Sequence, residues 1–429
     1  MELPREFIES TRALMGEERF NCYLAAFDEE PPVSIRLNPK SLSPAPSKGR
    51  GSSDTADDSE PPLPLEGVGE RLPWCRNAYY LDHRPNFTFD PLFHAGCYYV
   101  QEAASMFLDE VLRQLSITHC PLSIDMCAAP GGKSTLLRSA LPADSILVSN
   151  EPIRQRASIL LENVQKWGYE NHFVTNLYPR DFRKNLSKFF DKRSGSTGFD
   201  LILCDVPCSG EGMFRKDEAT IREWSPQNVE RCWQLQREIV SDSWACLNDG
   251  GLLIYSTCTF NTKENEENVR WILSQFDAQV LPIETRPEWN ITGSLLDGFI
   301  EPVYRFIPGI TRSEGLFMCV LRKGGSLPQR TKTPSLRVPS LEPLPLHTDG
   351  PRVELTYQQA IAFLRREALV LPSDAPRGIV EVCFMGQPLG MVKNLGTRAN
   401  NLYPKEWRIK STYVPSDYEP IVVPMSEKI

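Results

Sequence analysis

The chain has 429 residues, of which 41% are hydrophobic, enough for two or three domains with cores of their own. Its formal net charge of −8 excludes a protein coated in basic charge, so any nucleic-acid surface must be a local patch. No apolar run approaches the roughly 20 residues of a membrane span, the start lacks a signal-peptide pattern, and the twelve Cys lack paired CxxC spacing. We therefore expect a cytoplasmic protein that has neither a zinc module nor a disulfide framework, and that is a monomer with no membrane association.

Residues 1–90 predict a small N-terminal α+β domain. The helical pattern FIESTRALMGEERFNCYLAAF is followed by a strand, VSIRLN. Arg36 and Asn38 could face a substrate, although residues at this position more often lie at the solvated end of a strand. From about 41 to 65 the composition changes to Ser, Pro, Gly and Asp without periodicity, which predicts a flexible insertion.

Residues 91–323 alternate strands with helices, which predicts an α/β domain with a doubly wound, mostly parallel sheet. An amphipathic helix is expected after Gln101, and a long helix from Pro226 to Leu247. The predicted strands are LSID, SILVSNE, HFVTN, FDLILCD and GLLIYSTCTF, and a closing hairpin is formed by YRFIPG and GLFMCVLRK.

The stretch LSIDMCAAPGGKS joins the first of these strands to a helix, TLLRSAL, through a turn of small residues. Its glycines allow the backbone to approach a ligand, and the N–H groups at the helix start favour an anionic group. A P-loop is excluded because Cys127 stands where that motif needs Gly, and GxGxxG is absent. The loop fits a nucleoside without phosphates, such as S-adenosylmethionine (SAM), although a turn that merely packs tightly would use the same residues.

Glu151 follows the second strand of this domain. An acidic residue there is positioned to accept hydrogen bonds from ribose hydroxyls. The alternative is that it only favours the dipole at the start of the next helix.

Two cysteines follow apolar strands instead of lying inside them. Cys208 follows FDLILCD together with Asp205, and Cys258 follows GLLIYST. Both should reach the crevice at the carboxyl ends of the strands, whereas Cys204, Cys246 and Cys319 should be inert core residues.

A thiol beside a methyl donor suggests alkylation of carbon 5 of a pyrimidine. A thiolate that adds to carbon 6 makes carbon 5 nucleophilic, and a base must later remove the carbon 5 proton. Cys258, Asp205 and Cys208 could supply the thiolate, the group that hydrogen-bonds the ring and the base.

The C-terminal part begins after a Pro-rich linker over 324–351. Residues 352–429 predict a small β-rich domain with one helix, TYQQAIAFLRREAL, and strands around GIVEVCF, QPLGMVKN and WRIKS. Basic residues interleaved with aromatics suit RNA contact, and a solvated face around a small core is an equal alternative. The candidate RNA-binding residues are Lys393, Arg398, Tyr403, Lys405, Trp407, Arg408 and Lys410.

Four motifs together resemble the Nol/Nop/Sun family of SAM-dependent RNA cytosine-5 methyltransferases. They are DMCAAPGGKST, FDLILCDVPCSGEGMFRKD, GGLLIYSTCTFNTKENEENV and YYVQEAASM, in the family's order. The opening LPREFIESTRALMGEE and the tail VKNLGTRANNLYPKEWRIKS further resemble a bacterial branch that modifies 16S ribosomal RNA. The resemblance implies a Rossmann-like SAM-dependent methyltransferase core, an N-terminal RNA-binding domain and a PUA-like C-terminal RNA-binding domain.

The resemblance also implies roles for single residues. Cys258 would be the nucleophile, Cys208 would assist product release, and Asp205 would lie between cofactor and cytosine. The acidic adenosine contact expected near NLYPRDF does not align cleanly, because Tyr178 stands in its place. The candidate cofactor-binding residues are Cys127, Ala128, Ala129, Pro130, Gly131, Gly132, Lys133, Glu151, Arg156, Asn176, Asp181 and Asp205.

Other functions fit the sequence less well. An amino-group methyltransferase carries an Asn-Pro-Pro-Tyr type motif where this chain has DVPC, and a zinc cytidine deaminase needs His-x-Glu and Pro-Cys-x-x-Cys. A DNA cytosine methyltransferase would use the Pro-Cys cysteine as nucleophile and leave STC unexplained. A transfer RNA substrate and a non-catalytic ribosome-assembly protein that binds RNA remain as alternatives.

Overall fold

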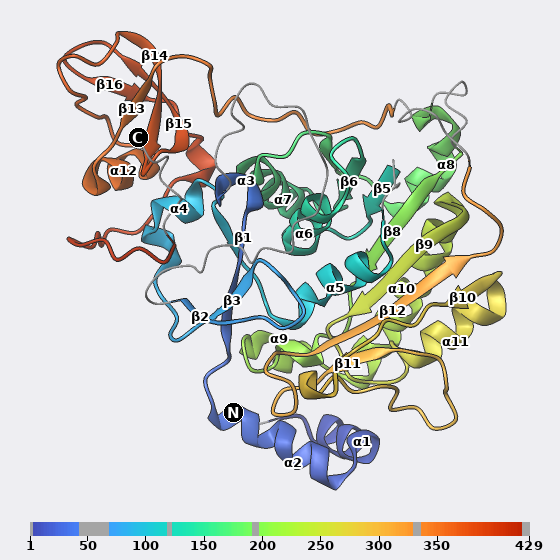
Figure 1. Ribbon diagram of the computed structural model, residues 1–429. Coiled ribbons are helices and arrows are strands. Elements are labelled where there is room, and N and C mark those ends of the chain that lie inside the picture. The colour runs from blue at the N-terminus through green and yellow to red at the C-terminus, as the bar shows by residue number, and fades with distance from the viewer. Residues whose placement is uncertain (1–2, 43–67, 118–121, 191–196, 329–335, 423–429) are drawn as a thin grey trace.

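The computed structural model describes residues 3–42, 68–117, 122–190, 197–328 and 336–422, and most of the insertion expected over 41–65 lies outside them. Three sheets organise this part of the chain (Figure 1). None of its helices combines the length and the apolar character that crossing a bilayer requires.

The N-terminal part contains a pair of helices and a four-stranded antiparallel sheet with the order β2-β3-β1-β4. Its elements are α1 (Arg5–Met15), α2 (Glu17–Ala25), η1 (Ala26–Asp28), β1 (Val33–Leu37), α3 (Pro39–Leu42), β2 (Val68–Arg71), β3 (Ala78–Leu81), η2 (Phe87–Phe89), α4 (Pro91–His94) and β4 (Tyr98–Val100). The N-terminal domain was expected to end at residue 90. Strand β4 lies after that residue but pairs with β1, so it belongs to the N-terminal sheet.

The central sheet has eight strands in the order β10-β12-β9-β8-β5-β6-β7, and β11 pairs with β12. Strands β5 to β9 are parallel, and the expected hairpin of β11 and β12 is confirmed. The strands are β5 (Leu122–Asp125), β6 (Ile146–Asn150), β7 (His172–Thr175), β8 (Phe199–Asp205), β9 (Leu247–Thr257), β10 (Ala278–Val280), β11 (Tyr304–Phe306) and β12 (Leu316–Lys323).

Helices cover both faces of this sheet, as the buried apolar strands require (Figure 1). Along β8, Leu201 and Leu203 face the cluster that contains α5 and α6, while Ile202 and Cys204 face the cluster that contains α8 and α10. Helix α8 runs from Pro179 to Phe189 and packs against α10 on this second face. The helices are η3 (Ala104–Met106), α5 (Phe107–Gln114), α6 (Gly132–Ala140), α7 (Arg154–Trp167), α8 (Pro179–Phe189), η5 (Glu211–Met213), α9 (Glu218–Glu223), α10 (Pro226–Cys246), α11 (Glu266–Gln275) and η6 (Pro287–Trp289).

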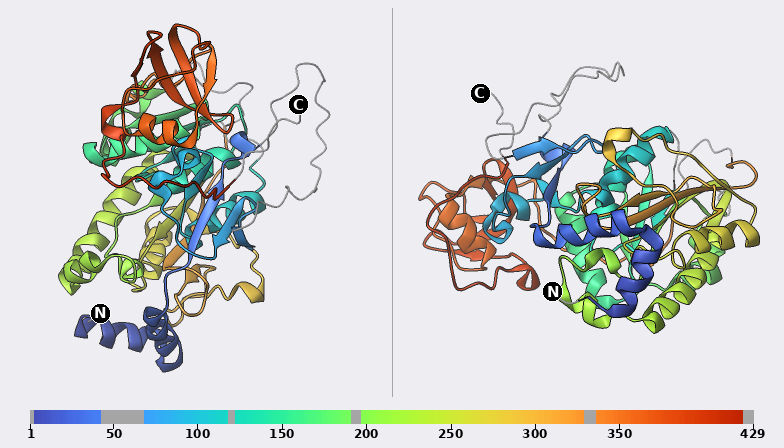
Figure 2. Two further views of the ribbon diagram at one scale, coloured as in Figure 1. Left: turned by 90° about the vertical axis from the view of Figure 1, so that its left-hand side faces the viewer. Right: turned by 90° about the horizontal axis from the view of Figure 1, so that it is seen from below.

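Helices α1 and α2 pack on the central domain and not on the N-terminal sheet. The ring centroids of Phe7 and Phe214 are 4.9 Å apart, and those of Tyr23 and Phe260 are 5.3 Å apart. Figure 2 shows these helices at one end of the molecule and the C-terminal sheet at the other. Helices α1 and α2 therefore support the loop that follows β9, in which Phe260 lies.

The C-terminal sheet has the order β13-β14-β15-β16, and it shares one hydrophobic core with the N-terminal sheet. In that core Ile35 and Leu92 belong to the same cluster as Phe363 and Val380. The expected strand at WRIKS is wrong, because a 3-10 helix ends at Trp407 and residues 408–411 form no strand. The elements are β13 (Arg352–Glu354), α12 (Tyr357–Leu364), β14 (Gly378–Phe384), β15 (Gln387–Asn394), β16 (Ala399–Asn401) and η7 (Lys405–Trp407).

The described part of the linker runs along β7, the outer strand of the central sheet. Ser340 forms an antiparallel bridge with Thr175, and the N–H of Leu341 donates to the carbonyl of Val174 over 2.7 Å. Gln165 on α7 makes two further hydrogen bonds with the backbone of Leu344. The composition of the linker did not predict this pairing.

Candidate functional site

The turn over residues 127–133, called the glycine loop below, follows β5 at the point where the strand order reverses, with β6 on one side of β5 and β8 on the other. Gly131 has a φ of +118°, and a Cβ there would lie 3.2 Å from Leu160. At Gly132, a Cβ would lie 3.4 Å from both Gln101 and Tyr99. The positive φ of Gly131 disfavours any side chain at that position, whereas a Cβ at Gly132 would only come into contact with its neighbours. The turn leads directly into the first N–H groups of α6, which favour an anionic group.

Asp125 ends β5 beneath this loop and is buried. Its Oδ2 accepts a hydrogen bond of 2.5 Å from Ser134, whereas its Oδ1 is buried without a donor among the described residues. Burial raises the pKa of Asp125 to about 7. A buried carboxylate oxygen that lacks a donor suits the ammonium group of an amino-acid-like ligand.

Glu151 lies directly after β6, and its side chain is only 2% exposed. It accepts a hydrogen bond of 2.9 Å from the N–H of Ile153 and lies 3.3 Å from the guanidinium of Arg156. Arg156 also donates to the carbonyl of Ala129, over 2.9 Å, and so connects the acid to the glycine loop.

The two residues considered for the adenosine contact have different surroundings. Asn176 donates to the carbonyls of Glu151 and Pro152, at 2.7 and 2.9 Å, and therefore lies beside the acid. Asp181 accepts from the N–H of Tyr178 at the start of α8, so this carboxylate caps the helix.

Cys208 and Cys258 come from the ends of β8 and β9, and their sulfur atoms are 3.2 Å apart. The N–H of Cys258 also lies 3.4 Å from the Cys208 sulfur. The contact with Cys258, followed by burial, raises the pKa of Cys208 well above that of an ordinary thiol. Cys204 and Cys319, which were expected to be inert core thiols, are fully buried.

Asp205 joins the thiols to the glycine loop. Lys133 donates to its Oδ2 over 2.8 Å, and Ser256 donates to its Oδ1 over 2.7 Å. Its side chain is 31% exposed, so it remains open to a ligand. The sequence reasoning placed Lys133 in the loop but missed this pairing, which spans 72 residues of chain.

A buried carboxylate holds both cysteine loops together. Glu264 accepts hydrogen bonds from the backbone and side chain of Ser209, which follows Cys208, and from the side chain of Asn261, which follows Cys258. Gln236 on α10 donates to the same carboxylate over 2.7 Å. The sequence reasoning missed Glu264, although the polar run NTKENEEN directly after a buried strand was a usable signal.

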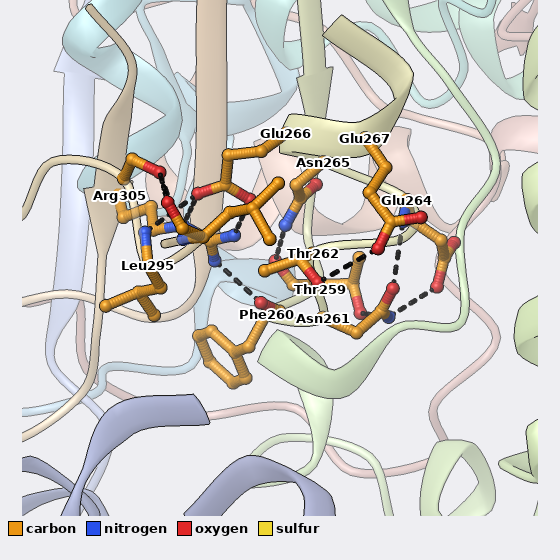
Figure 3. A network of polar contacts seen from close by, with 12 residues as sticks. Thr259, Phe260, Asn261, Thr262, Glu264, Asn265, Glu266, Glu267, Leu295 and Arg305 are labelled. Atoms are coloured by element: carbon orange, nitrogen blue, oxygen red, sulfur yellow. Dashed lines mark hydrogen bonds and ion pairs between the residues drawn. The ribbon is translucent and has the colours of Figure 1, made fainter. Parts of the chain in front are cut away.

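Further polar contacts fix the turn after Cys258 (Figure 3). Arg305 forms a buried ion pair with Glu266 and donates to the carbonyl of Phe260 over 2.7 Å. Asn265 donates to the carbonyl of Thr259 over 2.9 Å. The turn is therefore rigid before any ligand arrives.

Arg36 and Asn38 do not face a substrate cleft, so that expectation is wrong. Both are buried, and Asn38 donates to the carbonyls of Gly96 and Trp167 at 2.9 and 3.1 Å. Arg36 donates to the backbone of α6 and is described below. Each side chain connects β1 to the central domain.

The candidate RNA-binding residues also divide into two groups. Tyr403 is 2% exposed, and its ring packs 5.2 Å from that of Phe363, so base stacking on Tyr403 is wrong. Trp407 is half-buried, with the ammonium of Lys166 5.4 Å from its ring centre. The exposed basic side chains, which remain predictions, are Lys393, Arg398, Lys405, Arg408 and Lys410.

The fold and the site together define a Rossmann-like methyltransferase. A methyltransferase homolog protein from Pyrococcus horikoshii matches with a TM-score of 0.54 and 24% identity, over 75% of this chain and 100% of that one. NSun6 from Pyrococcus horikoshii with SFG matches with a TM-score of 0.55 and 22% identity, over 75% and 99%. These likenesses support the fold.

Family models identify the chain more closely. Residues 115–322 match 16S rRNA methyltransferase RsmB/F, residues 3–103 match the N-terminal domain of 16S rRNA methyltransferase RsmF, and residues 351–409 match the methyltransferase RsmF PUA domain. The chain belongs to the RsmB/F methyltransferase family, which confirms the resemblance found in the motifs.

Curated relatives agree with this assignment. Ribosomal RNA small subunit methyltransferase F of Pectobacterium atrosepticum is 31% identical over 76% of this chain, and the match spans 64% of that relative's length. The enzyme of the same name from Klebsiella pneumoniae is 27% identical over 94% of this chain and 96% of the relative.

Proposed function

We propose that this protein transfers a methyl group from SAM to carbon 5 of a cytosine in RNA, with 16S ribosomal RNA as the substrate. The observation that carries the proposal is the pair of thiols 3.2 Å apart beside an Asp205 carboxylate that Lys133 connects to the glycine loop. The names of the relatives support ribosomal RNA as the substrate.

The residues around the glycine loop fit SAM. Gly131 and Gly132 leave space at the start of α6, and Asp125 offers a buried carboxylate oxygen without a donor among the described residues. Glu151, which Arg156 connects to the loop, is the proposed acceptor for the ribose hydroxyls. SAM supplies the methyl group when it is bound. Asn176, next to Glu151, is the better placed of the two adenosine candidates.

Cys258 is the proposed nucleophile. Its sulfur adds to carbon 6 of the cytosine, the double bond between carbons 5 and 6 opens, and carbon 5 becomes able to accept a methyl group. Asp205 can accept a hydrogen bond from the 4-amino group of the ring, and from nitrogen 3 once that nitrogen carries a proton in the adduct. A base then removes the carbon 5 proton, the electron pair of that C–H bond restores the double bond between carbons 5 and 6, and the Cys258 sulfur leaves carbon 6 as a thiolate.

Cys208 is the proposed helper in that release. Its sulfur lies 3.2 Å from that of Cys258 and so within reach of the adduct. Cys208 is therefore the proposed base that takes the carbon 5 proton as the carbon–sulfur bond breaks.

A polar cleft of about 860 Å³ lies next to the loop and could hold the RNA around the flipped cytosine. The cationic side chains Arg84 and Lys216 line it together with His83, Glu30 and Glu102, and so does Gln101, which lies close to Gly132 in space.

Replacing each cysteine tests the mechanism. Cys208→Ala should accumulate a covalent protein–RNA complex on a denaturing gel, because the adduct forms but is not released. Cys258→Ser should give neither complex nor methylated RNA, and the exposed Cys22→Ser should behave as the wild type. Methyl transfer without a covalent species in Cys208→Ala, or trapping by Cys258→Ser, would contradict the assignment.

The substrate is tested separately. Bisulfite sequencing of ribosomal and transfer RNA from a deletion strain should show loss of one 5-methylcytosine in 16S ribosomal RNA. Loss from transfer RNA alone would identify the other substrate class.

A further inference from the structure

Arg36 is a buried cation of the N-terminal sheet whose side chain contacts the glycine loop. It lies on β1 and is 3% exposed. Its Nη2 donates to the hydroxyl of Thr135 over 2.6 Å and to the carbonyl of Gly132 over 3.2 Å. The hydroxyl of Thr135 lies 2.8 Å from the carbonyl of Gly131, to which it donates. One guanidinium therefore connects to both glycines of the turn.

The surroundings of Arg36 hold it in one position. Its Nε donates to Gln101 over 2.9 Å, and its guanidinium lies 4.4 Å from the ring centre of Trp167 and 6.0 Å from that of Tyr99. Gln101 and Tyr99 are also the side chains that face Gly132. The N-terminal sheet thus provides one wall of the loop.

No carboxylate forms an ion pair with Arg36 among the described residues, although Asp109 acts on its charge from a greater distance. All three of its hydrogen-bond acceptors are neutral oxygens. Burial lowers its pKa to about 10, which leaves the guanidinium charged at neutral pH. A positive charge under the first turn of α6 adds to the potential of the helix start and favours an anionic group there.

We propose that Arg36 is a positioning residue for the cofactor: it fixes the turn at Gly131 and Gly132 and favours the carboxylate of the bound amino-acid moiety. The inference rests on the proposed function, in which this loop holds SAM. It assigns to the N-terminal domain a part in cofactor binding besides any contact with RNA.

Calorimetry on the full-length protein tests this proposal by measuring its affinity for S-adenosylhomocysteine. Arg36→Met should weaken binding at least tenfold, and Arg36→Lys, which keeps the charge but not the fork of donors, should weaken it less. Lys40→Met is the matched control, because Lys40 also reaches the central domain but contacts Gly168 and Tyr169 instead of the loop. RNA affinity without cofactor should change less than twofold in all three variants.

Hydrogen exchange of the unliganded protein gives a second measurement. The amides of residues 131–137 should exchange faster in Arg36→Met than in the wild type and Lys40→Met. Unchanged exchange and unchanged binding in a folded Arg36→Met protein would overturn the proposal, as would a loss confined to RNA affinity. If Arg36→Met does not fold, Thr135→Val removes the contact from the other side and must produce the same two changes.

The two proposals fail in different ways. A wild-type protein that does not bind S-adenosylhomocysteine would refute the proposed function. The exchange of the loop amides would still decide whether Arg36 positions the turn.

Discussion

Asp125 has one carboxylate oxygen bonded to Ser134 and one that is buried without a donor. Its pKa of about 7 means that the folded protein holds a proton that the unfolded chain releases near pH 4. The contribution of this group to stability is therefore fully present below about pH 4 and is lost as the pH rises to 7.

The Asp125→Asn variant should show this directly. Its free energy of unfolding should decrease less between pH 4.5 and 8 than that of the wild type. At pH 8 the variant should be more stable than the wild type by up to about 4 kcal/mol, because no charge is buried. Its affinity for S-adenosylhomocysteine should fall, since the carboxylate is gone. Urea unfolding at the two pH values and calorimetry test both effects.

The exposed Asp297 gives the control. Asp297→Asn should keep the pH dependence and the affinity of the wild type. A pH dependence of stability that is unchanged in Asp125→Asn would show that the burial of Asp125 does not govern it.

At the scale of elements, the turn after β9 depends on Glu264, whose two oxygens both face donors. Four hydrogen bonds from Ser209, Gln236 and Asn261 converge on this carboxylate. A glutamine side chain accepts hydrogen bonds only at its oxygen. In this position its NH2 group would therefore face two of the four donors.

Glu264→Gln should therefore destabilise the protein by roughly 2–4 kcal/mol, because two buried donors would lose their acceptor. It should also lower kcat more than it raises KM, because both cysteine loops lose their support. Glu267→Gln is the matched control, since within the described ranges the side chain of Glu267 accepts one long hydrogen bond, from Thr262. Equal effects of the two substitutions on stability and kcat would contradict a special role for Glu264.

The sequence predicted those elements whose information is local. Apolar strands that end in Asp125, Asp205 and Thr257 and the small-residue turn were visible as runs and motifs, so the core topology could be inferred. The contacts made by Arg36 and Tyr23 could not, because their partners lie about 100 and more than 200 residues away in the chain. Local pattern carries no information on such packing.

At the scale of the whole molecule, the C-terminal domain has a structural part to play. Its core residues Phe363 and Val380 belong to one cluster with Ile35 and Leu92 of the N-terminal domain. Deleting the residues after Pro351 would expose that surface, so a loss of activity would say little about RNA. Charge reversal on the exposed face is the cleaner test.

The triple substitution Arg398→Glu, Arg408→Glu and Lys410→Glu should weaken RNA binding and flatten its dependence on salt by roughly 0.7 per lost phosphate contact. The melting temperature and the affinity for S-adenosylhomocysteine should not change, since all three side chains are exposed. Filter binding at several salt concentrations measures the effect.

Arg19 on α2 gives a control at the opposite end of the molecule (Figure 2). Arg19→Glu should leave the salt dependence as it is. An unchanged salt dependence in the triple variant would show that this face does not bind the RNA backbone.

The segment that connects the central and C-terminal domains also protects the molecule from self-association. An outer strand presents unpaired amides and carbonyls to which a strand of another copy can add. The bridge from Ser340 to Thr175 and the hydrogen bond from Leu341 to Val174 occupy that side of β7. The linker to the C-terminal domain therefore also covers the edge of the sheet at which a strand of another copy would pair.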